Sequence, residues 1–181
     1  IPKDHPSRDM QDTLYLTENT LLKTHNTGTT ARMLEKFANK NFSYFSIGKV
    51  YRNDEDDQTH SHQFTQLDFL SIDDHNIESL LWTIKSVLSY VFEQNLEIRT
   101  RPSFFPFTKP SIEVDIFYKG SWIEVLGAGM INEDVLKLAG YKNPHEFREI
   151  AGGIGIERIA MIKYGIKDIR EFFKNDLRML K

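Results

Sequence analysis

The sequence has 181 residues, of which 40% are hydrophobic, 12% aromatic and 27% charged. This composition excludes a disordered chain, and the length suits a single domain with a buried core. The 26 acidic and 23 basic residues give a net charge of −3, which argues against a protein that binds nucleic acid by itself, because such proteins usually carry a basic excess.

Two features that the sequence lacks narrow the class of protein further. It contains no cysteine, which excludes disulfides and thiolate metal sites and fits a cytoplasmic protein. It has neither an apolar run near the roughly 20 residues that span a bilayer nor a signal peptide, so we expect no membrane association. Ile1 stands at the start in place of a methionine, from which we expect a fragment or a processed product.

The first part of the chain predicts a helix followed by a hairpin. Residues 1–12 are polar and irregular. A helix is expected next, capped by Thr29 or Thr30, because apolar side chains recur at helical spacing through residue 38. Two stretches rich in aromatic and β-branched residues, 44–52 and 64–72, read as strands joined by the long polar loop 53–62.

The second part predicts one long helix and several short strands. Asn76 is expected to cap the strongest helix, whose apolar residues recur from 77 to 91. The remaining predicted elements are strands over 96–101, 112–118, 122–126 and 151–155, and helices over 132–138 and 156–164. Together they predict an α+β fold in which a mainly antiparallel β-sheet is flanked by helices, in one domain over residues 1–181.

The first segment that indicates chemistry covers residues 48–68 and includes Arg52. An arginine at the end of a strand, followed by an acidic loop and a return strand, can bind phosphate oxygens while the loop covers a nucleotide. The same pattern also describes a solvated hairpin tip. His60 and His62 do not complete a metal ligand set by themselves. The acidic run 54–57 lacks the glycine and the distal glutamate of a calcium-binding EF-hand loop.

Two other segments have a composition that a ligand site would use. Gly152–Met161 places glycines at the end of a strand and Arg158 at the start of a helix. The glycines alone indicate close helix–sheet packing, and a dinucleotide-binding turn is excluded because Arg158 stands where a third glycine is needed. In the segment 101–107, two prolines stiffen three phenylalanines, which form either core or an aromatic wall for a ligand.

In this order, the three segments together resemble class II aminoacyl-tRNA synthetases. The segment 48–68 matches the second motif of that class, and the segment 152–161 matches the third. Four stretches are further similar to the α subunits of bacterial phenylalanyl-tRNA synthetases: His5–Met10, Leu22–His25, Phe105–Phe107 and Tyr164–Arg170. The resemblance covers essentially the whole chain.

The resemblance implies ATP-dependent activation of L-phenylalanine to phenylalanyl-adenylate and its transfer to tRNA(Phe). It implies Mg²⁺ as cofactor and a phenylalanyl-tRNA synthetase β subunit as partner, in a heterotetramer of two α and two β subunits. The first motif and the N-terminal coiled coil of the family would precede Ile1, so a catalytic domain incomplete at its N-terminus is expected, and the activity of the chain alone is left open. The alternative is a synthetase-like module that binds nucleotide or amino acid without catalysis.

The resemblance also implies roles for residues of the nucleotide site. Arg52 would hold the α-phosphate and the reacting carboxylate, and Arg158 and Phe64 would enclose the adenine. His60 would reach the distal phosphates, and Asp54 would accept a hydrogen bond from the adenine amino group. Arg52, Arg158 and His60 are thereby the expected catalytic residues.

The amino acid site follows from the same resemblance. Phe105 and Phe107 would meet the substrate ring edge to face. The other expected amino-acid-binding residues are His25, Thr27, Gln66 and Asp68 around the charged groups, and Ala151 and Gly153 at the far end of the pocket. Asp68 stands where the family usually has glutamate. Glu124 is expected either as a magnesium ligand or as half of an ion pair at the edge of the core.

Overall fold

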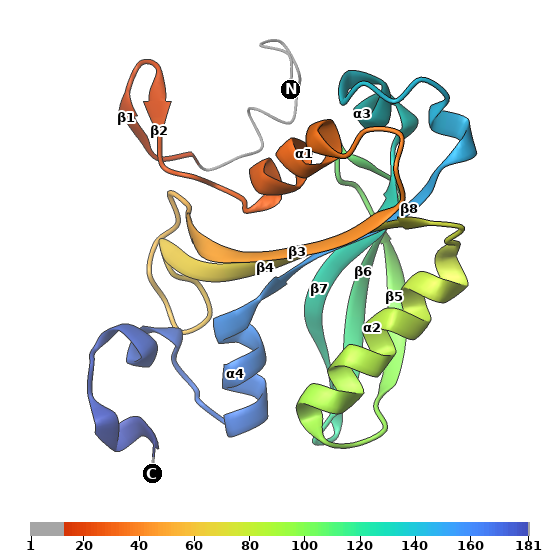
Figure 1. Ribbon diagram of the computed structural model, residues 1–181. Coiled ribbons are helices and arrows are strands. Elements are labelled where there is room, and N and C mark those ends of the chain that lie inside the picture. Colours follow the sequence, from red (N-terminus) through yellow and green to blue (C-terminus); the bar gives the residue numbers. More distant parts are fainter. Residues whose placement is uncertain (1–12, 181) are drawn as a thin grey trace. The chain divides into compact units, whose positions relative to one another are not determined.

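The protein is described by a computed structural model that covers residues 13–180 (Figure 1). The predicted irregular segment 1–12 lies outside the described residues. The chain divides into two compact units. Unit 1 comprises Ile1–Asn26, Ile47–Leu67 and Gly155–Lys181, and unit 2 comprises Thr27–Ser46 and Asp68–Ile154. The assignment of both units to one catalytic domain stays a prediction.

The main sheet has six strands in the order β3-β4-β8-β7-β6-β5; β5, β6 and β7 lie in unit 2, and β3, β4 and β8 have residues in both units. The strands are β3 (Phe42–Tyr51), β4 (Gln63–Asp73), β5 (Glu97–Ser103), β6 (Thr108–Tyr118), β7 (Ser121–Ile131) and β8 (Arg148–Gly155). The ladders from β5 to β8 are antiparallel, and β6 turns into β7 through Lys119 and Gly120, both at positive φ. This arrangement confirms the predicted α+β class with a mainly antiparallel sheet.

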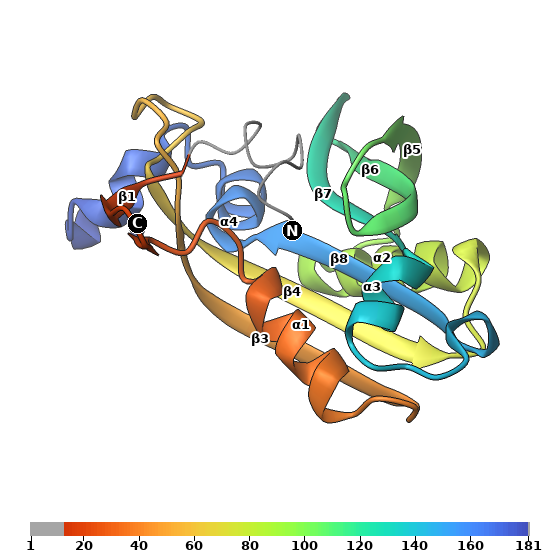
Figure 2. The same cartoon turned by 90° about the horizontal axis from the view of Figure 1, so that it is seen from above.

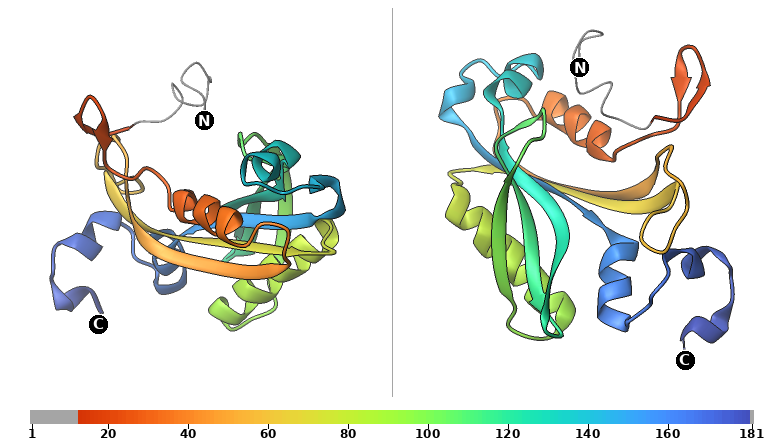
Figure 3. Two further views of the ribbon diagram at one scale, coloured as in Figure 1. Left: turned by 45° about the horizontal axis from the view of Figure 1, so that its top comes forward. Right: turned by 180° about the vertical axis from the view of Figure 1, so that it is seen from behind.

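Helices cover both faces of this sheet in unit 2. The helices are α1 (Thr27–Lys36), α2 (Ile77–Phe92), α3 (Glu133–Leu138) and the 3₁₀ turn η2 (Pro144–Glu146). Figures 2 and 3 show α1 and α3 on one face and α2 on the opposite face. The core beneath α1 and α3 consists of Leu34, Leu70, Ile72, Ile131, Leu136 and Tyr141.

Helix α2 begins and ends as its sequence indicates. The Asn76 side chain accepts from the Ser79 amide and the Ser79 hydroxyl accepts from the Asn76 amide, which completes a capping box. The helix buries Leu80, Ile84 and Leu88 and ends at Glu93, which has a left-handed backbone.

The predicted cap of the first helix, Thr29 or Thr30, is wrong. Helix α1 begins at Thr27, two to three residues before it. Thr30 is buried inside the helix, and the Thr27 hydroxyl donates to Asp68, so tertiary contacts and not the local sequence decide where the helix begins.

Unit 1 contains the remaining elements. They are the hairpin of β1 (Tyr15–Thr17) and β2 (Thr20–Leu21), the adjoining parts of β3 and β4, the helix α4 (Ile156–Tyr164), and the 3₁₀ turns η3 (Ile169–Phe173) and η4 (Leu177–Leu180). Helix α4 has the predicted bounds and ends at Gly165, whose φ is +71°. The β1–β2 hairpin was not predicted, because its short strands are exposed and show no core-facing pattern.

A close contact in unit 2 requires glycine at position 152. A Cβ atom on Gly152 would lie 2.6 Å from Cε1 of Phe69 and 3.1 Å from Cβ of Ala128. We expect Gly152→Ala to lower the free energy of unfolding by about 1–3 kcal/mol through overpacking. Denaturant unfolding measures this effect.

The same substitution at Gly28 serves as a control. Nothing lies within 4 Å of a Cβ atom there, and the position is helical, so Gly28→Ala is expected to be neutral or stabilising by about 0.5–1 kcal/mol. The double variant Phe69→Leu, Gly152→Ala should recover part of the loss. Equal losses with and without Phe69→Leu would show that the ring does not cause the effect.

Candidate functional site

The predicted amino-acid-binding residues of β8, Ala151 and Gly153, share one face of the sheet in unit 2. Directly opposed residues of antiparallel strands point to the same face. Gly127 of β7 opposes Gly153 of β8, and Gly129 opposes Ala151. On its other side Gly127 opposes Glu113, which opposes Arg101 of β5. One row of opposed residues on this face therefore runs from the charged pair, Arg101 and Glu113, to the two glycines, Gly127 and Gly153.

The Phe105 ring lies over the glycine part of that row. A Cβ atom on Gly127 would be 2.6 Å from Cζ of Phe105. The rings of Phe105 and Phe107 are stacked, with centroids 6.2 Å apart. The Ser111 hydroxyl accepts from the Phe105 amide at 3.1 Å and so holds the turn before β6. The structure thus brings the two aromatic side chains together and leaves both half-buried, as the aromatic-wall interpretation requires.

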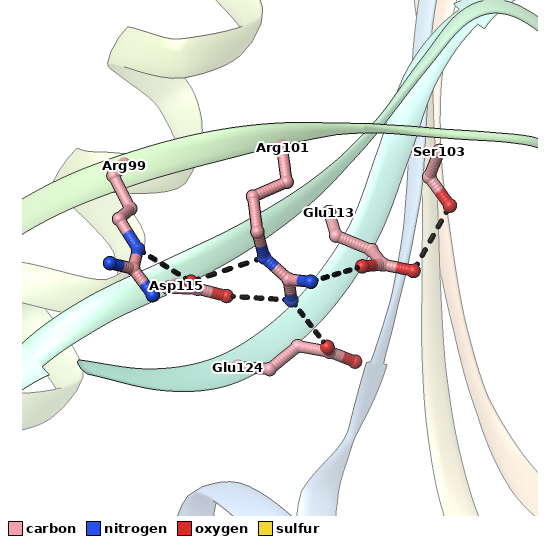
Figure 4. A network of polar contacts seen from close by, with 6 residues as sticks. All are labelled: Arg99, Arg101, Ser103, Glu113, Asp115 and Glu124. Atoms are coloured by element: carbon pink, nitrogen blue, oxygen red, sulfur yellow. Dashed lines mark hydrogen bonds and ion pairs between the residues drawn. The ribbon is translucent and has the colours of Figure 1, made fainter.

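A network of charged side chains crosses β5, β6 and β7 on the same face (Figure 4). The Arg101 guanidinium contacts three carboxylates, with Nη2 3.1 Å from Asp115 Oδ1 and 2.6 Å from Glu124 Oε2, and Nη1 3.1 Å from Glu113 Oε2. Arg99 adds a bond of 2.7 Å to Asp115. Burial alone would raise the pKa of Asp115, but the hydrogen bonds from both arginines outweigh burial and lower it.

The position of Glu124 bears on its two expected roles. The ion pair with Arg101 is present, whereas the magnesium role stays a prediction. Among residues 13–180, no group of three or more His, Asp or Glu side chains is arranged to hold a metal ion. Mg²⁺ is usually bound by only one or two carboxylates together with substrate phosphates. Glu124 fits such a partial ligand and not a complete protein site.

Glu149 is a buried acid that sequence reasoning did not single out. It precedes Ala151 by two residues in β8, so both side chains lie on the same side of the strand. Glu149 is 3% exposed, and within the described residues neither its Oε1 nor the hydroxyl of buried Tyr141 has a hydrogen-bond partner. Burial raises the pKa of Glu149 to about 7 and, with the charge of Glu149, that of Tyr141 to about 12. A glutamate next to the apolar and glycine residues of β8 was the available signal.

Unit 1 contains the residues predicted for the phosphates and the adenine. Arg52 directly follows β3, and its guanidinium lies 4.9 Å from the ring centroid of Phe64 at the start of β4. Burial, followed by the charge of Arg52, lowers the pKa of His25 to about 4, so His25 is neutral at pH 7. Within the part of the chain that the structure describes, neither Arg52 nor Arg158 has an ion-pair partner, in contrast to Arg101. Their charges remain available to an anion.

Buried hydrogen bonds orient the polar residues predicted around the amino acid. In unit 1 the backbone amide of Asn26 donates to Gln66 Oε1 at 3.0 Å. This bond turns the NH₂ group of Gln66 to the other side, where it can act as a donor. Lys23 in turn donates to the Asn26 side chain at 2.8 Å. In unit 2 the Thr27 hydroxyl donates to Asp68 Oδ2 at 2.6 Å. Asn26, only 2% exposed, was not predicted as part of the site.

The loop 53–62, which we call the nucleotide loop, is held by its own side chains. Asp57 accepts from the amides of Thr59 and His60, each at 2.6 Å, and lies 2.9 Å from Nδ1 of His60. Asp56 binds the amide and Nδ1 of His62 in the same way. The contact with His60 is the main cause that lowers the pKa of Asp57. Two of the four acidic residues in 54–57 therefore stabilise the loop itself, and Asp57 fixes the position of the exposed His60.

Glu157 connects the third-motif helix to the hairpin within unit 1. This residue begins the first turn of α4 and is 8% exposed. Its carboxylate accepts from the amide and the hydroxyl of Thr65, at 2.7 and 2.8 Å, and lies 3.8 Å from Nζ of Lys49. Sequence reasoning assigned no role to Glu157. These bonds fix the start of α4, and with it the adjacent Arg158, relative to β3 and β4.

The predicted site residues divide between the units as follows. Unit 1 contains His25, Arg52, Asp54, His60, Phe64, Gln66 and Arg158, and unit 2 contains Thr27, Asp68, Phe105, Phe107, Glu124, Ala151 and Gly153. Within each unit the structure brings many of them into direct contact or onto one face, and their individual roles stay predictions.

Comparison with known families assigns the class of protein. The family model described as the tRNA synthetases class II core domain (F) matches residues 1–181. The chain therefore belongs to the class II tRNA synthetase core-domain family. A solved pyrrolysyl-tRNA synthetase from Desulfitobacterium hafniense has the same fold, with a TM-score of 0.65 and 21% identity over 90% of this chain and 56% of that one. No helix of the described residues is long and apolar enough to cross a membrane.

Curated relatives specify the branch of the family that the chain is similar to. The phenylalanine–tRNA ligase α subunit of Bacillus pumilus is 49% identical over 196 residues, which cover 100% of this chain and 56% of the relative. The α subunit of Bacillus mycoides is 49% identical over 195 residues with the same coverage. The chain thus spans about half the length of the curated relatives it matches.

Glu149 provides a prediction on stability. Because its pKa is raised in the folded state, the native protein binds more protons, and stability falls as pH rises from about 4.5 to about 7. Glu149→Gln, which stays neutral, should raise the free energy of unfolding by about 1–2 kcal/mol at pH 8 and change it little at pH 4. Urea unfolding at both pH values measures the difference. Glu146→Gln, at an exposed position, controls for the lost charge. A gain that is equal at both pH values would contradict the prediction.

Proposed function

We propose that the chain is the catalytic core of a phenylalanine–tRNA ligase α subunit. It activates L-phenylalanine with ATP to phenylalanyl-adenylate and transfers the phenylalanyl group to tRNA(Phe). The observation that carries the proposal is the match to the class II core over the whole chain, together with 49% identity to curated α subunits of that ligase. Two observations support it: Arg52 and Arg158 have no ion-pair partner among residues 13–180, and the Phe105 ring lies over Gly127.

The nucleotide half of the reaction needs positive charge and a fixed adenine. The phenylalanine carboxylate attacks the α-phosphorus, the bond to pyrophosphate breaks, and charge spreads over the phosphate oxygens. Arg52 binds the α-phosphate, and Arg158 and Phe64 enclose the adenine, whose amino group donates to Asp54. His60, held by Asp57, donates to the distal phosphates. Mg²⁺, when bound, neutralises phosphate charge, and Glu124 is the carboxylate we assign to it.

The amino acid half needs an apolar pocket with polar groups at one end. Phe105 and Phe107 meet the substrate ring, and Ala151 and Gly153 limit the depth of the pocket. Asp68, oriented by Thr27, binds the ammonium group. In unit 1, the NH₂ group of Gln66, which donates to the carboxylate, and the neutral imidazole of His25 are further groups that we assign to the amino acid.

The partners and the location of the protein are part of the same proposal. A β subunit, in a heterotetramer of two α and two β subunits, supplies the rest of the enzyme, and the whole works in the cytoplasm. The net charge of −3 is consistent with a core that binds ATP and an amino acid while other surfaces hold much of the tRNA.

Phenylalanine-dependent ATP–pyrophosphate exchange tests the proposed function. In the full α subunit with its β subunit, Arg52→Ala should lower the exchange rate by about 10²–10³-fold, because it removes charge stabilisation from the transition state. Arg178→Ala, which removes an exposed arginine paired with Asp176, should leave the rate unchanged. If the wild-type protein binds ATP or phenylalanine without any exchange, the catalytic proposal fails, and the result favours a module that binds these ligands without catalysis.

The depth of the pocket gives a second test. Ala151→Gly removes one methyl group at the far end, so para-substituted phenylalanines should be accepted. The kcat/KM for para-chlorophenylalanine relative to phenylalanine is expected to rise about tenfold or more, in line with the 1–3 kcal/mol that such a group is worth in an apolar pocket. Ala139→Gly, in the loop after α3, is the matched control. An unchanged ratio in the Ala151→Gly variant would remove Ala151 from the pocket.

A further inference from the structure

We propose that η3 is a brace for the nucleotide loop, and that Ile169 and Arg170 are positioning residues for ATP. This inference rests on the proposed function, because it assigns the nucleotide loop to ATP. All of its contacts lie in unit 1, and Figures 1 and 3 show η3 beside the loop between β3 and β4. It concerns residues 169–173, to which none of the expected site residues belongs.

The first contact is a backbone hydrogen bond to the tip of the loop. The amide of Ile169 donates to the carbonyl of Gln58 at 2.9 Å. Ile169 is the first residue of η3 and is 5% exposed, so its N–H cannot turn to bulk water and needs this acceptor. Gln58 lies between the two aspartates and the histidines that they hold. The bond thus fixes the part of the loop from which His60 projects.

The second contact is electrostatic. Asp168 binds the Arg170 guanidinium at 2.6 and 2.8 Å, and this pair is the main cause that raises the pKa of Arg170. Asp56 and Asp57 raise it further, which places the Arg170 charge near the acidic part of the loop. Four successive acidic residues would repel a triphosphate. Arg170 offsets part of that repulsion from outside the loop.

The third contact connects η3 to the base of the hairpin. Nζ of Lys49 lies 4.9 Å from the ring centroid of Phe173 and 3.8 Å from Glu157 Oε1. Glu157 binds Thr65 in β4, so one set of contacts reaches β3, β4 and α4. η3 therefore holds the nucleotide loop at its tip and contacts the strand from which the loop starts.

The consequence is that the loop is ordered by the protein before ATP binds. A flexible loop would have to be immobilised by the nucleotide, at a cost in affinity, whereas a loop already held in place avoids that cost. Weakening the brace should therefore raise the KM for ATP and leave the KM for phenylalanine unchanged.

Ile169→Pro removes the donor with little disturbance of the backbone. Proline is tolerated at the first helical position, and Asp168 has φ −137° and ψ 117°, the extended conformation that a residue before proline prefers. Ile169→Ala shortens the same side chain and retains the N–H, so the pair separates the hydrogen bond from packing. In the full α subunit with its β subunit, we expect the KM for ATP to rise about tenfold in Ile169→Pro relative to Ile169→Ala, the effect of losing about 1.4 kcal/mol.

Hydrogen exchange provides the readout that does not depend on activity. The amides of the nucleotide loop should exchange faster in Ile169→Pro than in Ile169→Ala, while those of α2 stay unchanged. If the unvaried enzyme shows no pyrophosphate exchange, the proposed function fails, and hydrogen exchange alone decides on the brace. Equal KM values for ATP and equal loop exchange in the two Ile169 variants would overturn it.

Arg170→Gln keeps the inference testable if Ile169→Pro does not fold. Arg170 is exposed, so this substitution leaves the packing intact. We expect the KM for ATP to rise about threefold, with a smaller rise at high salt because salt screens exposed charges. Arg178→Gln, in η4, is the matched control. A KM for ATP that does not change in Arg170→Gln would overturn the electrostatic part, and with unchanged loop exchange it would overturn the brace.

Discussion

The packing in unit 2 depends on glycines of β7 and β8, because their lack of a Cβ atom leaves room for groups of neighbouring segments. The space of a Cβ atom is filled by the Phe105 ring at Gly127, by Thr108 and the Pro110 carbonyl at Gly129, and by the Phe69 ring at Gly152. The Phe105 ring of the aromatic wall can lie against the sheet only because Gly127 lacks a side chain. Strands rich in glycine are weak by themselves, since they lose more conformational entropy and pack nothing. Here groups of neighbouring segments fill the space that a Cβ atom would take, so these contacts stabilise the sheet, and at Gly127 they also hold the Phe105 ring against it.

The charged side chains of the protein differ in the partners that they contact. Arg101 is neutralised by three carboxylates on adjoining strands, which makes it part of the scaffold. Arg52 lies over the Phe64 ring, a weak partner that a phosphate can replace. In the nucleotide loop, two aspartates hold histidines and so contribute order instead of an open negative patch. Among the described residues, an arginine with a carboxylate partner and one without it thus differ in how far their charge is neutralised, although the sequence writes them alike.

Local patterns predicted most of the elements but not all of their limits. The cap at Asn76 depends on neighbouring residues alone, and it appears where expected. β7 extends to Ile131, beyond its predicted end at residue 126, because the glycines that interrupt the strand pattern pair with β6 and β8. Glu149 was not predicted, because its burial depends on the packing of the whole unit and leaves no pattern in the neighbouring residues. The ion pair of Glu124 with Arg101, on another strand, could be established only from the tertiary structure.

The sequence by itself determined the α+β class, most of the elements and the motifs that resemble class II synthetases, because these depend on residue types at short, fixed spacings. Only the tertiary structure decided which side chains share a face and which charges are already paired. Gln66 shows the difference: its identity suggests a polar contact, but the Asn26 amide, 40 residues away, decides that its NH₂ group is the free end. Contacts between distant segments arise from packing of the whole unit, and a local pattern carries no record of them.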